Sequence, residues 1–164
     1  METLDQQIEA IISEAPNDGI TVSLVRAIAP LLKQTASQLK HPKYHVLQGR
    51  DDGWVITTLS NRTQPELEKS VIYAFPTIED AQAKLSSNQG HEIKVVGIPV
   101  IQILFRLIAL QRVESAIFFE ERGNSKQGTE IPCHDFRTQV QAYLAAYQSQ
   151  QRSRGASPLP PTIA

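Results

Sequence analysis

The sequence has little cysteine and no surplus of charge of either sign. Cys133 is the only cysteine among 164 residues, so no internal disulfide can form, which suits a reducing compartment. Lysine and arginine number 16 against 17 aspartates and glutamates, giving a formal net charge of −1. Proteins that bind a phosphate backbone usually carry a basic excess. The balance of charge therefore argues against nucleic acid as a partner.

The sequence also lacks an apolar run long enough to cross a membrane. Its most apolar stretch, residues 98–110, has about 13 residues against the roughly 20 that a bilayer requires, and Arg106 lies near its middle. Pro99 suits the first turn of a helix. Residues 1–7 are polar and acidic and show no signal or transit peptide. We therefore expect a soluble, cytoplasmic protein without a membrane span.

Composition and length predict one folded domain with a tail. Hydrophobic residues make up 41% and charged residues 20% of the chain, as in ordinary globular proteins, and 164 residues suffice for one core. We expect residues 1–40 to form a helical pair packed on an α+β core at 41–150, as one domain. Residues 151–164 are rich in Arg, Ser, Gly and Pro and are predicted to be disordered.

Two helices are expected at the N-terminus. The first spans residues 4–14, because Thr3 and Gln6 have the spacing of a capping box and one face is apolar. The second begins at Thr21, which we expect to be its cap, and ends before His41-Pro42. Pro30 lies inside it, so we expect a kink or a restarted helix there.

The remaining elements alternate between strands and helices. Runs rich in β-branched and aromatic residues predict strands at 44–48, 54–59, 71–75, 93–98 and 113–120. The first two are expected to form a hairpin through an Asp-Gly turn. Helices are predicted at 77–85, 99–112 and 136–150, the last capped by Asp135, and residues 123–128 are predicted to be a mobile loop. These elements define an α+β fold with a mixed or antiparallel sheet of about five strands and packed helices.

The residue types that carry chemistry do not form a convincing site in the sequence. Cys133, His134 and Asp135 offer a nucleophile, a base and an acid, but adjacent side chains point in different directions, whereas a triad is assembled from distant segments. His41, His45 and His91 are scattered and cannot supply the converging ligands of a zinc site. The sequence therefore predicts no catalytic, cofactor-binding or metal-binding residues.

Two short motifs also receive an ordinary interpretation. Residues 123–128 are flanked by glycines, but Ser125 precedes Lys126, the reverse of the order in a phosphate-binding loop. We expect a solvated connection there. Residues 158–161 have the spacing of a polyproline ligand, although one short match in a proline-rich tail carries little information.

The apolar stretch is the most informative feature of the sequence. On a helix its apolar residues cover well over half of the circumference and leave a narrow polar edge at Gln102 and Arg106. Two interpretations remain open. The helix lies at the centre of the domain, between the sheet and the N-terminal helices, which we favour, or part of it faces a partner or a second copy of the chain.

One region resembles a known family. Residues 71–77, Val-Ile-Tyr-Ala-Phe-Pro-Thr, lead into the acidic helix start Ile78-Glu79-Asp80-Ala81, and the apolar helix and the strand at 115–119 follow. This arrangement, over residues 54–120, resembles the N-terminal domain of SseB-like proteins. Because that family has no established catalytic residues, the resemblance implies an accessory or interaction role.

Two hypotheses for the function follow. The first is a non-catalytic accessory or protein-binding domain that acts through an apolar helical surface, with an unidentified protein or a second copy of the chain as partner. The second is a small enzyme whose site is assembled from separate loops and uses His91, His134 or Cys133. A deep pocket with converging polar groups would favour the enzyme, and an exposed apolar surface would favour binding.

Overall fold

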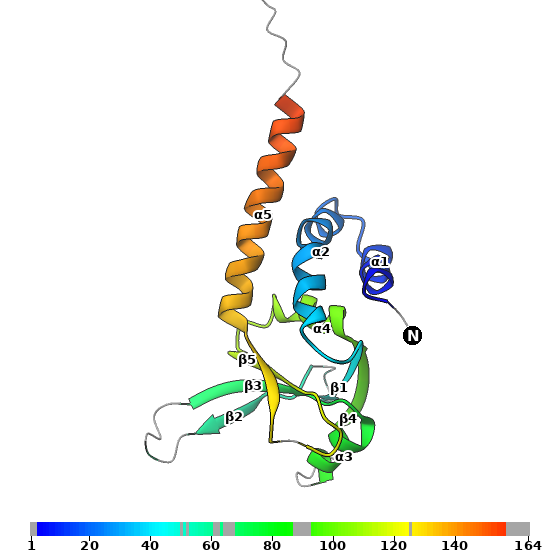
Figure 1. Cartoon of the computed structure of the whole chain (residues 1–164), viewed down its shortest axis with the longest axis vertical. Coiled ribbons are helices and arrows are strands. Elements are labelled where there is room, and N and C mark those ends of the chain that lie inside the picture. Colours follow the sequence, from blue (N-terminus) through cyan, green and yellow to red (C-terminus); the bar gives the residue numbers. More distant parts are fainter. Residues whose placement is uncertain are drawn as a thin grey trace, which may run out of the picture.

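The computed structural model describes residues 3–49, 51, 53–60, 63, 68–86, 93–124 and 126–156, the last six by their backbone alone. Over these residues the helices are α1 (Leu4–Glu14), α2 (Thr21–Ser37), α3 (Ile78–Ser86), α4 (Val100–Leu107) and α5 (Cys133–Ala156). The strands are β1 (Lys43–Gln48), β2 (Thr57–Ser60), β3 (Glu68–Ala74), β4 (Lys94–Pro99), β5 (Ser115–Phe119) and β6 (Gly128–Pro132). The predicted α+β class and the N-terminal helical pair are confirmed (Figure 1).

The strands form two sheets that are joined at one point. A four-stranded sheet has the order β2-β3-β5-β6, and β1 pairs with β4 in a two-stranded sheet. Only β3 and β5 pair in parallel among the described strands. His45 of β1 and Phe75 exchange two backbone hydrogen bonds of 2.8 Å. This bridge links the two sheets, so the single mixed or antiparallel sheet that the sequence predicts is divided into two.

The described strands number six instead of about five, because β6 was not predicted. It begins at Gly128, where the sequence suggests only the end of a loop. Half-buried Thr129 and Ile131 alternate with exposed residues in β6. An alternation of this length is too short to be recognised without its partner β5. The predicted hairpin is present only at its turn, where the Gly49 N–H donates to the Gly53 carbonyl at 2.7 Å and Gln48 bridges to Trp54. Beyond the turn the prediction is wrong, because β1 pairs with β4 and β2 pairs with β3.

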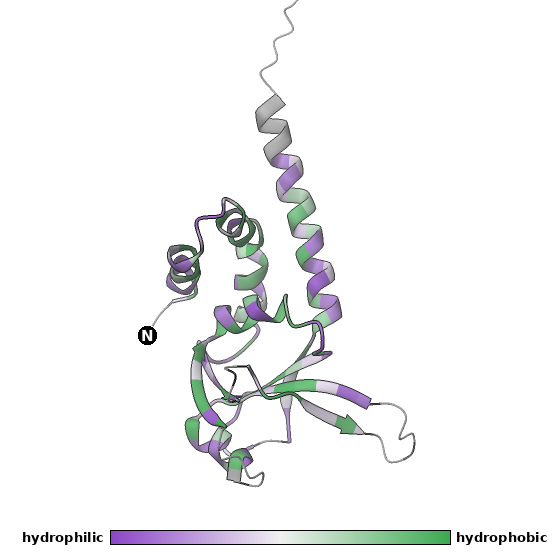
Figure 2. Cartoon of the chain, turned by 180° about the vertical axis from the view of Figure 1, so that it is seen from behind, coloured by the Kyte–Doolittle hydropathy of each residue, from purple (hydrophilic) through white to green (hydrophobic). Residues whose placement is uncertain are grey.

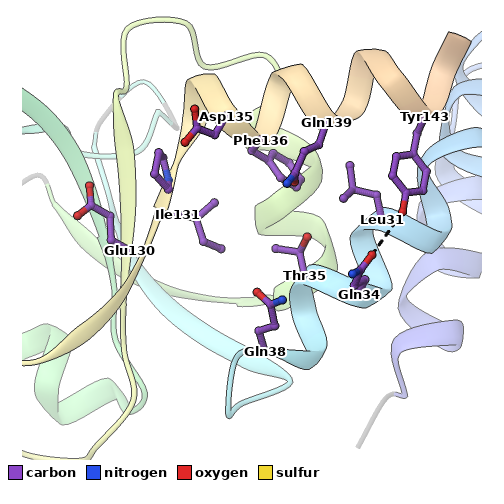
Figure 3. A pocket seen from close by; sticks show the side chains of 11 residues that line it. Leu31, Gln34, Thr35, Gln38, Glu130, Ile131, Asp135, Phe136, Gln139 and Tyr143 are labelled. Carbon is purple, nitrogen blue, oxygen red and sulfur yellow. Dashed lines mark hydrogen bonds between the residues drawn. The ribbon is translucent and has the colours of Figure 1, made fainter.

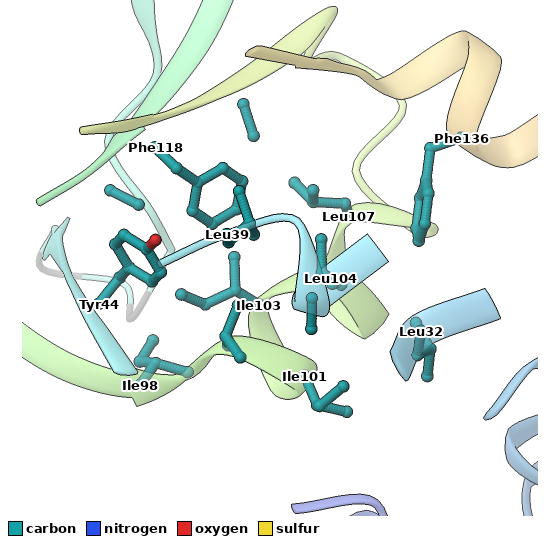
Figure 4. Close-up of a cluster of buried hydrophobic side chains, with 14 of the residues drawn as sticks. Leu32, Leu39, Tyr44, Ile98, Ile101, Ile103, Leu104, Leu107, Phe118 and Phe136 are labelled. Atoms are coloured by element: carbon teal, nitrogen blue, oxygen red, sulfur yellow. The ribbon is translucent and has the colours of Figure 1, made fainter. Parts of the chain in front are cut away.

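Helix α4 lies at the centre of the molecule, as favoured from the sequence. It contacts α1 and α2 on one side and β4 on the other. Five of its side chains are fully buried, namely Val100, Ile101, Ile103, Leu104 and Leu107. Figure 4 shows four of them, Ile101, Ile103, Leu104 and Leu107, between Tyr44 and Phe118 of the sheets, Leu32 of α2 and Phe136 of α5. The most apolar element is therefore scaffold, and it ends at Leu107 rather than at Arg112.

The N-terminal helices are fixed to this core by Gln7. Its side chain is buried, donates to the Pro42 carbonyl at 3.0 Å and accepts from the Ile101 N–H at 2.9 Å. The predicted capping box of α1 is present. Helix α2 continues through Pro30 without a restart. Ile20, not Thr21, occupies the N-cap position, and its side chain makes no capping hydrogen bond. The Asp18 carboxylate caps the backbone there instead, because it accepts from the Ile20 and Thr21 N–H groups, each at 2.9 Å.

Helix α5 is longer than predicted at both ends. It begins at Cys133, so Asp135 lies in its first turn instead of being its N-cap. A carboxylate there still interacts favourably with the helix dipole. The helix continues to Ala156, six residues beyond the predicted end at Gln150, since Gln and Arg favour helices. Residues 157–164 lie outside the described residues, and their predicted disorder stays a prediction.

Figure 1 shows α5 leaving the sheet and running past α2, with its far end extending beyond the other helices. In Figure 2 the part of α5 that leaves the sheet is banded with apolar and polar residues. Its first half packs on the core through buried Phe136 and Val140, and the half-buried Tyr143, Leu144 and Tyr147 continue this stripe. Helices α2 and α5 therefore lie side by side from the sheet to the start of α2. We call this line of contact the seam.

Candidate functional site

The structure does not bring Cys133, His134 and Asp135 together as a triad. Cys133 is fully buried, whereas His134 and Asp135 are exposed. Burial raises the pKa of the Cys133 thiol, which reduces its content of the nucleophilic thiolate. The Cys133 N–H donates to the Glu114 carbonyl at 2.8 Å. Cys133 thus belongs to the junction between β5 and α5.

The histidines lie in separate places. The His41 Nε2 atom is 2.7 Å from the Glu120 carbonyl oxygen. In His45, burial and then the charge of Lys43 lower the pKa. His91 lies outside the described residues, as do residues 158–161. Within the described part of the chain, no group of three or more His, Cys, Asp or Glu side chains is arranged to hold a metal ion.

Three backbone N–H groups of the glycine-flanked loop are engaged by other groups of the protein. Gly123 has a φ of 80°, a left-handed conformation that glycine adopts readily. Its N–H donates to the Asp80 carboxylate at 2.9 Å, and the Asn124 N–H donates to the Glu121 carbonyl at 3.0 Å. The Lys126 N–H donates to the Asn124 side chain at 2.9 Å. These N–H groups are engaged, unlike those of a phosphate-binding loop.

Two hollows lie along the seam between α2 and α5. The lower one, next to the sheet, is a polar cleft of about 470 Å³. Its floor is apolar and its rim carries amide, hydroxyl and carboxylate groups (Figure 3). The lining comes from α2, β6 and α5 and consists of Leu31, Gln34, Thr35, Gln38, Glu130, Ile131, Pro132, Asp135, Phe136, Gln139 and Tyr143.

Some polar groups of this cleft already form hydrogen bonds or salt bridges within the protein. Glu130 forms a salt bridge with Lys69 and accepts a 2.6 Å hydrogen bond from the Ser115 hydroxyl. These two partners hold the pKa of Glu130 below its ordinary value. The Tyr143 hydroxyl donates to the Gln34 side chain at 3.3 Å across the seam. Glu130 therefore stays ionised near neutral pH and is unsuited to donate a proton.

The upper hollow is an apolar groove of about 540 Å³ between the start of α2 and the middle of α5. We call it the α2–α5 groove. It is lined by Gly19, Ile20, Ser23, Leu24, Ala27, Leu144, Tyr147 and Gln148. Of the described residues, no charged one lines it. Its volume is in the range of ligand pockets, but its open, apolar character suits a partner surface better than a reactive centre.

Ile20, at the edge of this groove, is unusually exposed for a large apolar residue. Its side chain is 70% exposed, the largest exposure of a large hydrophobic residue in the described chain. It immediately precedes α2, where Asp18 holds the backbone of Ile20 by a 2.9 Å hydrogen bond. The sequence analysis missed Ile20 because it follows turn residues. The available signal was an isoleucine one position before a helix start, outside the apolar stripe of that helix.

No protein-family model matches the chain. No curated protein matches it either. Among the described residues, no helix is both long enough and apolar enough to cross a membrane.

Proposed function

We propose that the protein is a non-catalytic accessory domain that binds another protein through the α2–α5 groove. The observation that carries the proposal is the apolar lining of this groove beside the exposed side chain of Ile20. Exposed apolar surfaces that line a concavity are typical of protein interaction sites. The accessory role agrees with the one that the resemblance to SseB-like proteins implies. The cytoplasm is the proposed location, because Cys133 is buried and free of disulfides.

The chemistry of the groove defines the segment that it accepts. The two walls are helices, and an apolar face of a third helix fits between them by the helix-in-groove mode. Since no described charged residue lines the groove, a charge on the docked face would be desolvated without a partner. The expected ligand is therefore an uncharged, apolar helix face of the partner. The net charge of −1 supports a protein rather than a nucleic acid.

Ile20→Glu tests this proposal against a matched control. The charge would be placed at the mouth of the groove without a change to the core, because Ile20 is 70% exposed. Ile78→Glu on α3 changes another exposed isoleucine, 47% exposed, away from the groove lining. Both variants and the unchanged protein are used to capture partners from native lysate, with quantification by mass spectrometry. We expect Ile20→Glu to lose a partner by about tenfold or more, and Ile78→Glu to retain it. Equal capture by the two variants would contradict the proposal.

The second candidate, a small enzyme, is favoured only by the polar cleft. The cleft has the volume of a substrate pocket, and carboxylate, amide and hydroxyl groups converge on it. Against this, the pKa of Glu130 is held below its ordinary value, the reverse of what a general acid at neutral pH needs, and Asp135 is exposed to solvent. If the unchanged protein converts a substrate and the folded Asp135→Asn variant does not, the enzyme hypothesis is favoured.

A further inference from the structure

Strand β2 is a free edge of the four-stranded sheet. The sheet order β2-β3-β5-β6 leaves β2 with a partner on one side only. Figure 1 shows β2 and β3 projecting together, away from α2 and α5. Thr58, Leu59 and Ser60 are exposed, and Ile56 just before the strand is 42% exposed. An edge strand presents unpaired backbone N–H and C=O groups, which are a template for pairing with another strand.

The other described strands that border a sheet carry protection, and β2 does not. Proteins commonly protect an edge with charged residues or proline. Strand β6 contains Glu130 and Pro132, and β4 contains Lys94 and Pro99. Strand β1 begins with a lysine and is bridged to Phe75. In contrast, β2 reads Thr-Thr-Leu-Ser, and residues 54–60 contain no charge, proline or glycine. This edge is therefore the one that the sequence leaves open to pairing.

We propose that two copies of the chain associate through β2, which pairs antiparallel with β2 of the second copy. An uncharged strand pairs with itself without placing like charges opposite each other. With a two-fold axis at Thr58, the two Thr58 side chains face each other, and Thr57 lies opposite Leu59 of the partner copy. Threonine pairs on neighbouring strands are favourable. The two four-stranded sheets then form one continuous sheet.

This association is independent of the proposed function. The lining of the α2–α5 groove contains no residue of β2 or β3, so each copy keeps its groove. A two-fold pairing is isologous and closes after two copies, which distinguishes it from open-ended aggregation through the same edge.

The oligomeric state of the full chain tests the inference. Sedimentation equilibrium is measured at high micromolar concentration for the unchanged protein, for Thr58→Lys and for Thr129→Lys. Thr129 lies on β6, at the opposite edge of the same sheet. We expect a dimer for the unchanged protein and for Thr129→Lys. Thr58→Lys places two ammonium groups opposite each other and should weaken association by about tenfold or more. Far-UV circular dichroism verifies that both variants are folded.

A cysteine at the axis reports the pairing directly. Opposite residues of an antiparallel pair have Cα atoms about 4.5–5.5 Å apart, within the range of a disulfide. Because native Cys133 is buried, oxidation of Thr58→Cys should give a disulfide-linked dimer through the new thiol. A monomeric unchanged protein, a dimer that Thr58→Lys does not weaken, or an absent crosslink at position 58 would each overturn the inference.

Discussion

Glu120, one residue beyond the end of β5, ties this strand to residues 40–44. Its carboxylate accepts a hydrogen bond from the Tyr44 hydroxyl and another, of 2.9 Å, from the Lys40 N–H. Its carbonyl oxygen contacts the ring of His41. Burial, followed by the hydrogen bond to Glu120 and its negative charge, raises the pKa of Tyr44 far above its ordinary value. The tyrosine therefore remains a donor wherever the protein is folded.

Tyr44→Phe should destabilise the fold by about 1.5–3 kcal/mol, because a hydrogen bond to a charged group is lost and the carboxylate is left less satisfied. Tyr143→Phe is the control, since its hydroxyl meets a neutral amide at 3.3 Å in an exposed position and should cost about 1 kcal/mol or less. Urea unfolding measures the loss in the free energy of unfolding for each of the two variants. Equal losses would show that the Tyr44–Glu120 hydrogen bond contributes no more to stability than the Tyr143–Gln34 hydrogen bond.

Leu104→Asp should unfold the protein. Leu104 is fully buried, with 0% exposure to solvent. Its replacement by aspartate therefore buries a carboxylate without a partner. That costs several kcal/mol, a large part of the ~5–15 kcal/mol that stabilise a domain. Ile78→Asp, at a position 47% exposed, should melt as the unchanged protein does. A cooperatively melting Leu104→Asp variant in circular dichroism would show that α4 is not the centre of the core.

The cap of α2 makes a pH-dependent contribution to stability. Hydrogen bonds from the backbone N–H groups of Thr21 and Ile20 lower the pKa of Asp18 to about 2. The folded pKa lies below the ordinary 3.8, so this stabilisation is present above about pH 4 and is lost as the pH falls toward 2. Asp18→Ala should therefore lower the melting temperature at neutral pH, and the difference from the unchanged protein should shrink between about pH 4 and pH 2. A difference that does not vary with pH would contradict this account, and Asn17→Ala serves as the control for a nearby exposed site.

At the scale of elements, α5 divides into a packed half and an extended half. The side chains that line the α2–α5 groove end at Gln148. Truncation after Gln151 should leave the melting temperature unchanged, because the removed sequence, rich in Arg, Ser, Gly and Pro, offers no periodic apolar face. Truncation after Ala142 removes Tyr143, Leu144 and Tyr147, which pack against the core, and should lower it clearly. Similar effects of the two truncations would show that the far end of α5 contributes to the fold.

Element boundaries were predictable where a neighbouring residue determines them. Thr3 with Gln6 begins α1, and Thr77, whose hydroxyl accepts from the Asp80 N–H at 3.1 Å, begins α3. At the end of α4 the backbone changes to turns with i→i−3 hydrogen bonds, such as that from the Leu110 N–H to the Leu107 carbonyl at 3.2 Å, and a distant residue also contacts this segment. The Arg137 guanidinium on α5 donates to the Leu110 carbonyl just beyond the end of α4, at 3.3 Å. No local pattern in residues 98–112 carries that information, so the predicted helix was too long.

At the scale of the whole molecule, the sequence predicted the fold class and the position of α4, but not the groove. Leu24 belongs to the apolar stripe of α2, and Leu144 and Tyr147 belong to that of α5. What the sequence did not contain is how the two stripes meet. They come from opposite ends of the chain, and where they lie side by side they leave the α2–α5 groove next to Ile20. A groove of this kind depends on how two helices pack, which periodicity alone does not specify.

The central claim, that the α2–α5 groove is the partner-binding surface, is tested most directly by crosslinking from its wall. A photoreactive benzoylphenylalanine replaces Tyr147, an aromatic residue that lines the groove, and in a second protein it replaces Ile78 on α3. Irradiation in living cells should give a discrete crosslinked protein of one mass from position 147 and none from position 78. The absence of a product at position 147, or the same product from both positions, would contradict the claim.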